Sequence, residues 1–288
     1  MIRVDLFINR TNLQTCSQTS PRTGKIYMKI ALNSLEETNT AKIKPFTVSC
    51  ERCKVRKMCL PASLNNEEVK QLDGIIERKH LLHRNEFLFK EGSKLDSLYV
   101  VRTGVLKVCK TAFADKVQIT GFFFPGQLLG LDGIGNGVHP SSAIALETSA
   151  ICQIPYTRLE SLSARIPNLL LRMYRSLSRE IIEDQQLITL LGKNTARERV
   201  AALLIQLINH NVNQRLSDRH IRLPMKRVDI ANHLGLTEET VSRTFSHLEK
   251  LKILNVTKRE IVILDAHALL KGWQSSNAES RPRQGQGL

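Results

Sequence analysis

The sequence predicts an α+β protein with an N-terminal antiparallel β-roll sensor domain, a long dimerisation helix and a C-terminal winged helix-turn-helix. Three observations predict this fold. Short β-type runs punctuated by glycines fill residues 87–154, an apolar heptad-like seam follows Pro167, and two short helical patterns meet at Gly235. Short strands separated by regular turn signals are typical of an antiparallel roll or barrel.

The composition is compatible with two domains and a polyanionic partner. The chain has 288 residues, 42% of them apolar, which is enough for a sizeable core. Its net charge of +15 suits a polyanionic partner. No apolar run is long enough to span a membrane, and Asp5 and Asn9 interrupt any signal-peptide core. A cytoplasmic protein is therefore expected, in which six cysteines favour metal or redox chemistry over disulfides.

Residues 1–49 have no sustained periodicity and are expected to form a weakly structured extension. The predicted sensor domain, residues 50–165, begins with Cys50, Cys53 and Cys59 on a basic loop. Thiolates are the soft ligands that zinc and iron–sulfur clusters prefer, and nearby Arg and Lys side chains stabilise them. Reduced surface thiols are the alternative. A zinc knuckle would need a second nearby pair of ligands, and none follows Cys59.

An amphipathic helix is predicted from Asn65 to about Leu82, and the strands of the roll follow. The expected strands are Phe87–Phe89, Leu98–Val101, Val105–Cys109, Val117–Ile119, Phe122–Phe124, Ala143–Leu146 and Ala150–Ile154. Cys109 and Cys152 fall within two of these strands, where a cysteine is most often a small buried hydrophobic residue.

The predicted dimerisation helix, residues 166–192, carries a 4-3-4-3 seam that is typical of a helix paired with its own copy. The seam residues are Leu170, Tyr174, Leu177, Ile181, Asp184, Ile188 and Leu191. Asp184 interrupts the seam, and two such carboxylates across a two-fold axis would repel each other. Packing of this helix on its own domain, with Asp184 in solvent, is the alternative.

The predicted DNA-binding domain, residues 193–270, begins with a helix over 195–209 whose apolar face is Val200, Leu203, Leu204 and Leu207. The helix-turn-helix follows. Its first helix has an apolar stripe at Val228, Ala231 and Leu234, and Gly235 provides the turn. Thr237 is a favourable N-cap for the second helix, whose inward stripe is Val241, Phe245 and Leu248.

The opposite face of the second helix presents Glu239, Ser242 and Arg243. Arginine can bind guanine through two hydrogen bonds, glutamate can accept from cytosine, and serine adapts to either. This arrangement favours double-stranded DNA as the partner over a solvated surface corner. Two strands flanking Lys258–Glu260 predict a wing, and residues 271–288 are expected to be a disordered tail.

The order of these parts resembles that of the CRP/FNR regulators, and specifically the FNR branch, from about Cys50 to Leu270. The stretches that carry the resemblance are Gln118–Phe122, Ala145–Ser149, Ile166–Leu169, Glu198–Ala202, Leu234–Thr237 and Glu239–Arg243.

The resemblance implies one [4Fe–4S] cluster held by Cys50, Cys53, Cys59 and Cys152, which replaces the buried-residue interpretation of Cys152. It also implies base reading by Glu239, Ser242 and Arg243 at an inverted repeat of TTGAT-type half-sites. Ile181 and Asp184 match the positions that set the balance between monomer and homodimer. Cys16 and Cys109 match no ligand position.

The implied function is oxygen-responsive regulation of anaerobic genes. The intact cluster would favour dimer and DNA, oxygen would destroy the cluster and release the DNA, and RNA polymerase is an expected partner. A cyclic nucleotide is not expected, because Leu131 follows Gly130 and the phosphate-binding region reads His139–Ser142, with no arginine.

Two alternatives remain at this stage. A regulator of the same family could sense cysteine oxidation or another metal. A thiol oxidoreductase that uses the Cys50–Cys53 pair is the second, although no thioredoxin-like strand–helix unit accompanies this pair. No catalytic triad or phosphate-binding glycine loop is present, so an enzyme is not predicted.

Overall fold

The computed structural model describes residues 49–112 and 116–271. The predicted N-terminal extension, with Cys16, and the predicted C-terminal tail lie outside these residues, except for their edge residues 49 and 271. None of the helices in the described part is long and apolar enough to cross a membrane.

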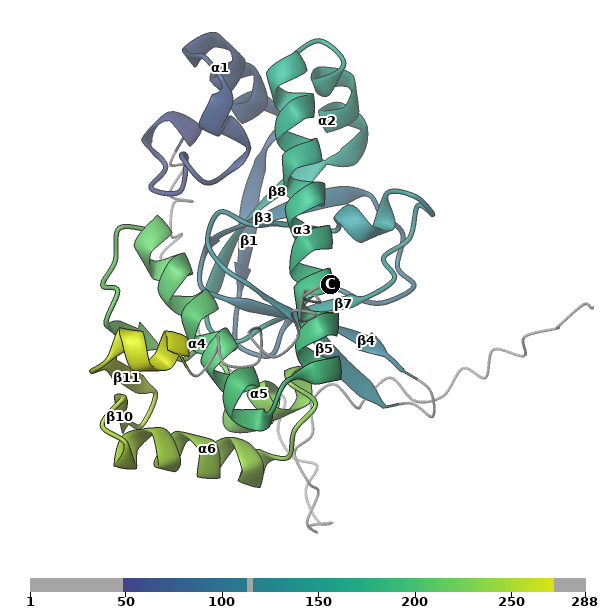
Figure 1. Cartoon of the computed structure of the whole chain (residues 1–288). Helices are drawn as coiled ribbons and strands as arrows, with labels where there is room; N and C mark the ends of the chain where they lie inside the picture. Colours follow the sequence, from purple (N-terminus) through teal and green to yellow (C-terminus); the bar gives the residue numbers. More distant parts are fainter. Residues whose placement is uncertain (1–48, 113–115, 272–288) are drawn as a thin grey trace, which may run out of the picture. The chain divides into compact units, whose positions relative to one another are not determined.

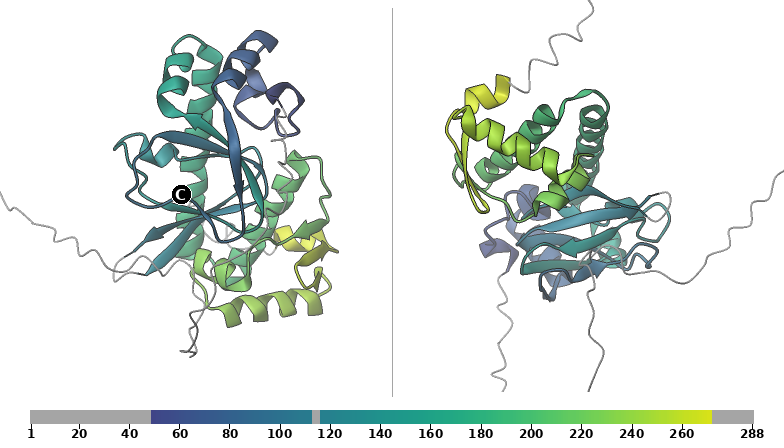
Figure 2. Two further views of the ribbon diagram at one scale, coloured as in Figure 1. Left: turned by 180° about the vertical axis from the view of Figure 1, so that it is seen from behind. Right: turned by 90° about the horizontal axis from the view of Figure 1, so that it is seen from below.

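Two four-stranded antiparallel sheets form the predicted β-roll (Figure 1). The first has the order β1-β8-β3-β6, with β1 at Glu77–Leu82, β8 at Ser149–Pro155, β3 at Ser97–Thr103 and β6 at Leu128–Leu129. The second has the order β2-β7-β4-β5, with β2 at Phe87–Phe89, β7 at Ser142–Ala145, β4 at Leu106–Thr111 and β5 at Val117–Phe123. Figure 2 shows the same sheets from behind. The fold confirms the predicted antiparallel roll.

Two local predictions in this domain are wrong. The helix predicted to reach Leu82 is α1 (Asn66–Ile75), and residues 77–82 instead form β1, which pairs with β8. Gly74, a poor helix former, precedes the end of α1, and Ile76 is already extended. The two short strands predicted over residues 117–124 are one strand, β5, which pairs with β4 around a bulge at Val108 and Cys109.

A small apolar core beside the first sheet joins the cysteine loop to the helices. The loop contains two short 3-10 turns, η1 (Cys50–Arg52) and η2 (Leu60–Ser63). Side chains of the loop, of α1, of α2 (Tyr156–Ser163) and of α3 (Pro167–Lys193) share this core. Its buried members include Cys50, Leu60, Leu72, Leu159, Leu169 and Met173. The loop is therefore packed into the domain.

α3 is the predicted dimerisation helix, and it starts at Pro167, where the fixed φ of proline suits the first turn. Leu169 and Met173 face the core, whereas three apolar seam residues face solvent: Tyr174 is 58% exposed, Ile181 56% and Ile188 70%. The structure thus leaves three large apolar seam residues uncovered, whereas Leu170, Leu177 and Leu191 are partly buried and Leu177 packs against the chain's own core. Pairing of this helix with its own copy stays a prediction.

The C-terminal part has the predicted winged helix-turn-helix. It consists of α4 (Ala196–Asn213), β9 (His220–Arg222), α5 (Arg227–His233), α6 (Glu238–Lys250), β10 (Leu254–Thr257) and β11 (Glu260–Ile263). The wing strands pair antiparallel in the order β10-β11-β9, and β10 lies beside α6 (Figure 1). The third strand, β9, was not predicted, because its three residues carry no periodic signal of their own.

Candidate functional site

The second helix of the helix-turn-helix, α6, buries one face and exposes the other. Val241, Phe245 and Leu248 are at most 3% exposed, as the inward stripe predicts. Glu239, Ser242 and Arg243 are all exposed on the opposite face. The structure therefore places the three predicted base-reading side chains together on an open helix surface.

The turn before α6 has the predicted chemistry. Gly235 has a φ of +60°, and the Thr237 hydroxyl accepts a hydrogen bond from the Thr240 amide at 3.1 Å. The predicted stripe on α5 is partly wrong, because Val228 is 48% exposed and the fully buried residue is Ile230. A seven-residue helix makes only two turns, so packing against neighbouring elements decides which of its apolar residues turns inward.

Two of the base-reading candidates are paired with each other. Arg243 Nη2 lies 2.6 Å from Glu239 Oε1, one turn away, and both side chains are more than 70% exposed. An ion pair this exposed contributes about 0–1 kcal/mol. Arg243 can therefore leave Glu239 for a base edge at little cost.

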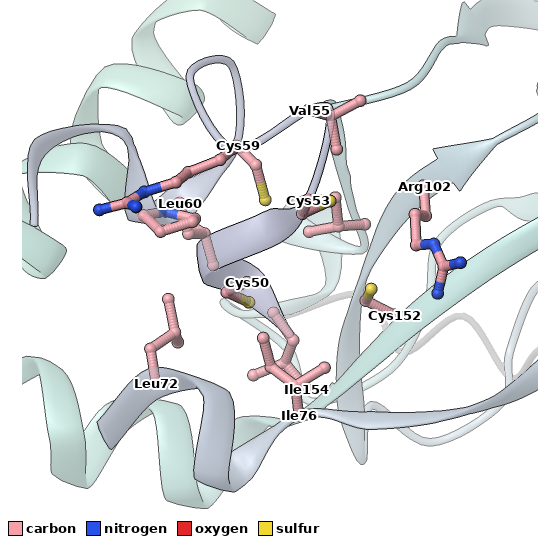
Figure 3. Close-up of a pocket in the computed structure, with 13 residues that line it drawn as sticks. Cys50, Cys53, Val55, Cys59, Leu60, Leu72, Ile76, Arg102, Cys152 and Ile154 are labelled. Carbon is pink, nitrogen blue, oxygen red and sulfur yellow. The ribbon is translucent and has the colours of Figure 1, made fainter. Parts of the chain in front are cut away.

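The four predicted metal ligands line one pocket (Figure 3). Cys50, Cys53 and Cys59 come from the loop, and Cys152 comes from β8, with apolar side chains such as Leu72 and Ile154 around them. Among the residues that the structure describes, no carboxylate lines the pocket, and the guanidinium of Arg102 lies beside Cys152. Tertiary folding thus brings Cys152 to a loop that lies about a hundred residues earlier in the sequence. Cys109, by contrast, is buried in β4 and does not line this pocket.

The surroundings of Cys59 favour its neutral thiol over the thiolate. Burial raises the pKa of the Cys59 thiol to about 12, and the neighbouring Cys152 and Cys53 push the pKa in the same direction. A neutral buried thiol is a poor nucleophile, whereas a metal ion displaces its proton. Within residues 49–112 and 116–271, however, no three Cys, His, Asp or Glu side chains are grouped as a metal-ion site. The thiols share a pocket but do not form a closed ligand set.

Both ends of the cysteine loop are anchored by charged side chains that the sequence did not single out. The Cys50 amide donates to Asp73 Oδ1 of α1 at 2.7 Å. At the other end, Arg172 of α3 donates from Nη2 to the Met58 carbonyl at 2.6 Å and from Nε to the Cys59 carbonyl at 3.2 Å. Each contact joins residues far apart in the chain, so no local pattern predicts it.

The predicted switch residues of α3, Ile181 and Asp184, are both exposed and lie one turn apart on the seam. Burial, and then the charge of Asp132, raise the pKa of Asp184. Burial raises the pKa of Glu180 to about 7, with further contributions from Asp132 and Asp184. Asp184 on the seam therefore lies near other carboxylates, Glu180 of α3 and Asp132, that disfavour its charge even within a single chain.

Arg199 of α4 connects the end of α3 to the helix-turn-helix. Its guanidinium donates to the carbonyls of Leu191 at 2.8 Å, Asn194 at 2.9 Å and Leu234 at 2.9 Å. Leu191 belongs to the last turn of α3, and Leu234 caps α5. One half-buried guanidinium thus connects the end of α3 to the helix-turn-helix.

The first helix of the helix-turn-helix also contacts the roll. The Asn232 side chain accepts from the Ile119 amide at 2.6 Å and donates to the Val117 carbonyl at 2.8 Å, so it satisfies the free edge of β5. Lys107 Nζ lies 2.8 Å from Asp229 Oδ1, and these side chains are only 14% and 10% exposed. These contacts hold α5 against β5.

Two protein-family models match separate parts of the chain. Residues 198–271 match the model of the Crp-like helix-turn-helix domain, and residues 79–165 match the cyclic nucleotide-binding domain. The Fumarate and nitrate reduction regulatory protein of Escherichia coli strain K12 is 44% identical over 222 residues, covering 77% of this chain and 89% of that protein. The Anaerobic regulatory protein of Pasteurella multocida is 43% identical over 224 residues, covering 78% and 82%.

Among solved structures, FixK2 from Bradyrhizobium japonicum aligns with a TM-score of 0.60 and 28% identity, covering 67% of this chain and 94% of FixK2. The curated relatives are regulatory proteins rather than enzymes. By its domains and its relatives, the chain belongs to the CRP/FNR family of DNA-binding transcription regulators.

Proposed function

We propose that this chain is an oxygen-responsive regulator that binds a [4Fe–4S] cluster through Cys50, Cys53, Cys59 and Cys152. The convergence of these four thiols on one pocket is the observation that carries the proposal. The names of the relatives, which refer to anaerobic regulation and to fumarate and nitrate reduction, support it. When bound, the cluster would be the group that reacts with oxygen.

The pocket suits such a cofactor chemically. Its donors are soft thiols, its other walls are mainly apolar, and its charged lining residues, Arg56 and Arg102, are cations that offset thiolate charge. The segment from Cys53 to Cys59 is held by turns rather than by regular helix or strand. Cys53 and Cys59 can therefore move toward a cluster without breaking a regular helix or strand.

We further propose that the homodimer forms through the exposed seam of α3. Ile181 and its apolar neighbours would be buried against the partner, whereas the two Asp184 side chains would repel each other. The dimer is then marginal, and a modest extra stabilisation from the loaded cysteine loop shifts the equilibrium. Without that stabilisation the repulsion prevails and the chains separate.

A dimer presents two α6 helices to an inverted repeat, and we propose TTGAT-type half-sites read by Glu239, Ser242 and Arg243. The exposure of all three side chains on one face of α6 supports this assignment. Control of transcription also requires a contact with RNA polymerase, which we expect as a further partner.

A cyclic nucleotide is not part of this proposal, although the roll matches that domain family. Leu131 is 4% exposed and His139 is 1% exposed, and the His139 ring stacks on Phe89 with 3.8 Å between ring centroids. These buried side chains lie in the two stretches, after Gly130 and at His139–Ser142, whose sequence argues against a cyclic nucleotide.

The test is the visible spectrum, with iron and acid-labile sulfide assays, of protein purified without oxygen and then exposed to air. A brown protein with about four irons and four sulfides per chain that bleaches in air is expected. A protein that stays colourless after anaerobic reconstitution would overturn the cluster. It would leave a regulator of this family that senses thiol oxidation or another metal.

A further inference from the structure

α3 extends from the cysteine pocket to the exposed seam. Near its start, Leu169 and Met173 are buried in the same core as Cys50 and Leu60. Two turns further along, the seam residues Ile181, Asp184 and Ile188 are exposed to solvent. A shift of the first turns of this rigid helix is therefore a shift of the seam.

Arg172 is the side chain of this helix that bonds to the end of the cysteine loop. Its Nη2 and Nε donate to the carbonyls of two successive loop residues, Met58 at 2.6 Å and Cys59 at 3.2 Å. The planar guanidinium has fixed donor directions, so two bonds to neighbouring carbonyls define the orientation of the loop relative to the helix.

Two other arginines of α3 differ from Arg172 in their exposure to solvent. Arg175 and Arg179 on the same helix are exposed to solvent, whereas Arg172 is half-buried against the loop. Desolvating a cation is unfavourable unless its donors are satisfied, and here the Met58 and Cys59 carbonyls accept from it. The contact is thus specific to position 172 and does not reflect a general basic surface.

We propose that Arg172 is a positioning residue that couples the cysteine loop to α3, so that the placement of Cys59 sets the placement of the dimer seam. The inference rests on the proposed function, because it assigns the route from the cofactor pocket to the dimer. Cys59 is at once a proposed ligand, through its thiol, and an Arg172 acceptor, through its carbonyl. Movement of the Cys59 thiol toward a metal centre would therefore also move the Cys59 carbonyl, which accepts a hydrogen bond from Arg172 of α3.

The test compares Arg172→Ala and Arg172→Lys with the unsubstituted chain, and Arg175→Ala serves as the matched control. Iron and sulfide content report loading, and anaerobic sedimentation equilibrium gives the dimer dissociation constant with and without the cluster. The coupling is the ratio of the two constants. We expect Arg172→Ala to load iron normally but to lower this ratio at least about fivefold. Arg172→Lys should restore part of the ratio, and Arg175→Ala should leave it unchanged.

An unchanged ratio in Arg172→Ala would overturn the proposal, as would an equal fall in Arg175→Ala, which would indicate a general charge effect. A second measurement requires no cofactor: hydrogen exchange of the apo chains. Arg172→Lys should speed amide exchange in two segments. These are residues 53–60 of the cysteine loop and residues 167–175, the first turns of α3. Acceleration confined to one of the two segments would contradict the coupling. If the unsubstituted chain binds no iron, the proposed function fails while the exchange measurement still decides the role of Arg172.

Discussion

Replacing Arg243 with alanine tests the DNA-reading face of α6. In the free chain Arg243 is 79% exposed, and its one ion pair, to Glu239, contributes about 1 kcal/mol at most. The substitution should therefore change the free energy of unfolding by no more than about 1 kcal/mol. On DNA, a bidentate arginine–base contact contributes about 1–3 kcal/mol per half-site. A homodimer loses two such contacts, so the operator affinity should fall at least about thirtyfold.

The assay is fluorescence anisotropy at one fixed ionic strength and without oxygen, at protein concentrations at which the dimer persists. One labelled duplex carries the inverted TTGAT repeat, and the other has the same composition with scrambled half-sites. The specific duplex should lose most of its affinity and the scrambled duplex little. Lys250→Ala, which removes an exposed cation from the far end of the same helix, should lower both affinities by a similar small factor.

Two outcomes would contradict the assignment of Arg243 to a base edge. An equal loss on both duplexes would make Arg243 a phosphate contact, because phosphates carry no sequence information. No loss on either duplex would remove Arg243 from the interface.

The remaining predictions concern the seam and the pocket. Asp184→Ala should allow dimerisation and operator binding in air, because the seam repulsion is removed; sedimentation showing an aerobic monomer would refute this. Cys152→Ser should abolish iron binding and Cys109→Ser should not, so loss of iron from the Cys109 variant alone would mean that the ligand set is wrong. The raised pKa of Glu180, about 7, means that this carboxyl gains a proton as the pH falls from 8 to 6, which removes a negative charge next to Asp184 of the seam. The dimer should therefore tighten over that range, and Glu180→Gln should weaken the dependence; a dimer that loosens at pH 6 would show that the seam carboxylates do not control it.

Local sequence patterns were sufficient to predict features that lie within one helix or one turn. The inward stripe of α6, the Thr237 cap and the positive φ of Gly235 follow from helix periodicity and turn chemistry, and the structure has all three. The exposed seam of α3 follows from the same periodicity. Such features depend on residues a few positions apart, and one sequence is enough to predict them.

The failures have a common cause. Residues 77–82 form a strand because β8 offers them a partner more than sixty residues away, and that pairing outweighs local helical preference. Ile230 rather than Val228 is buried because a helix of two turns takes its orientation from its neighbours. In both cases the deciding interaction is non-local.

The sequence by itself determined the class of this protein: an antiparallel roll, a long helix with an apolar seam and a winged helix-turn-helix with Glu239, Ser242 and Arg243 on its outer face. Only the tertiary structure decided that Cys152 reaches the pocket of the cysteine loop, and that Arg172 contacts that loop from 113 residues away. The reason is physical. Periodicity records which side of an element is apolar, whereas the bonds that connect distant elements depend on how the whole chain packs.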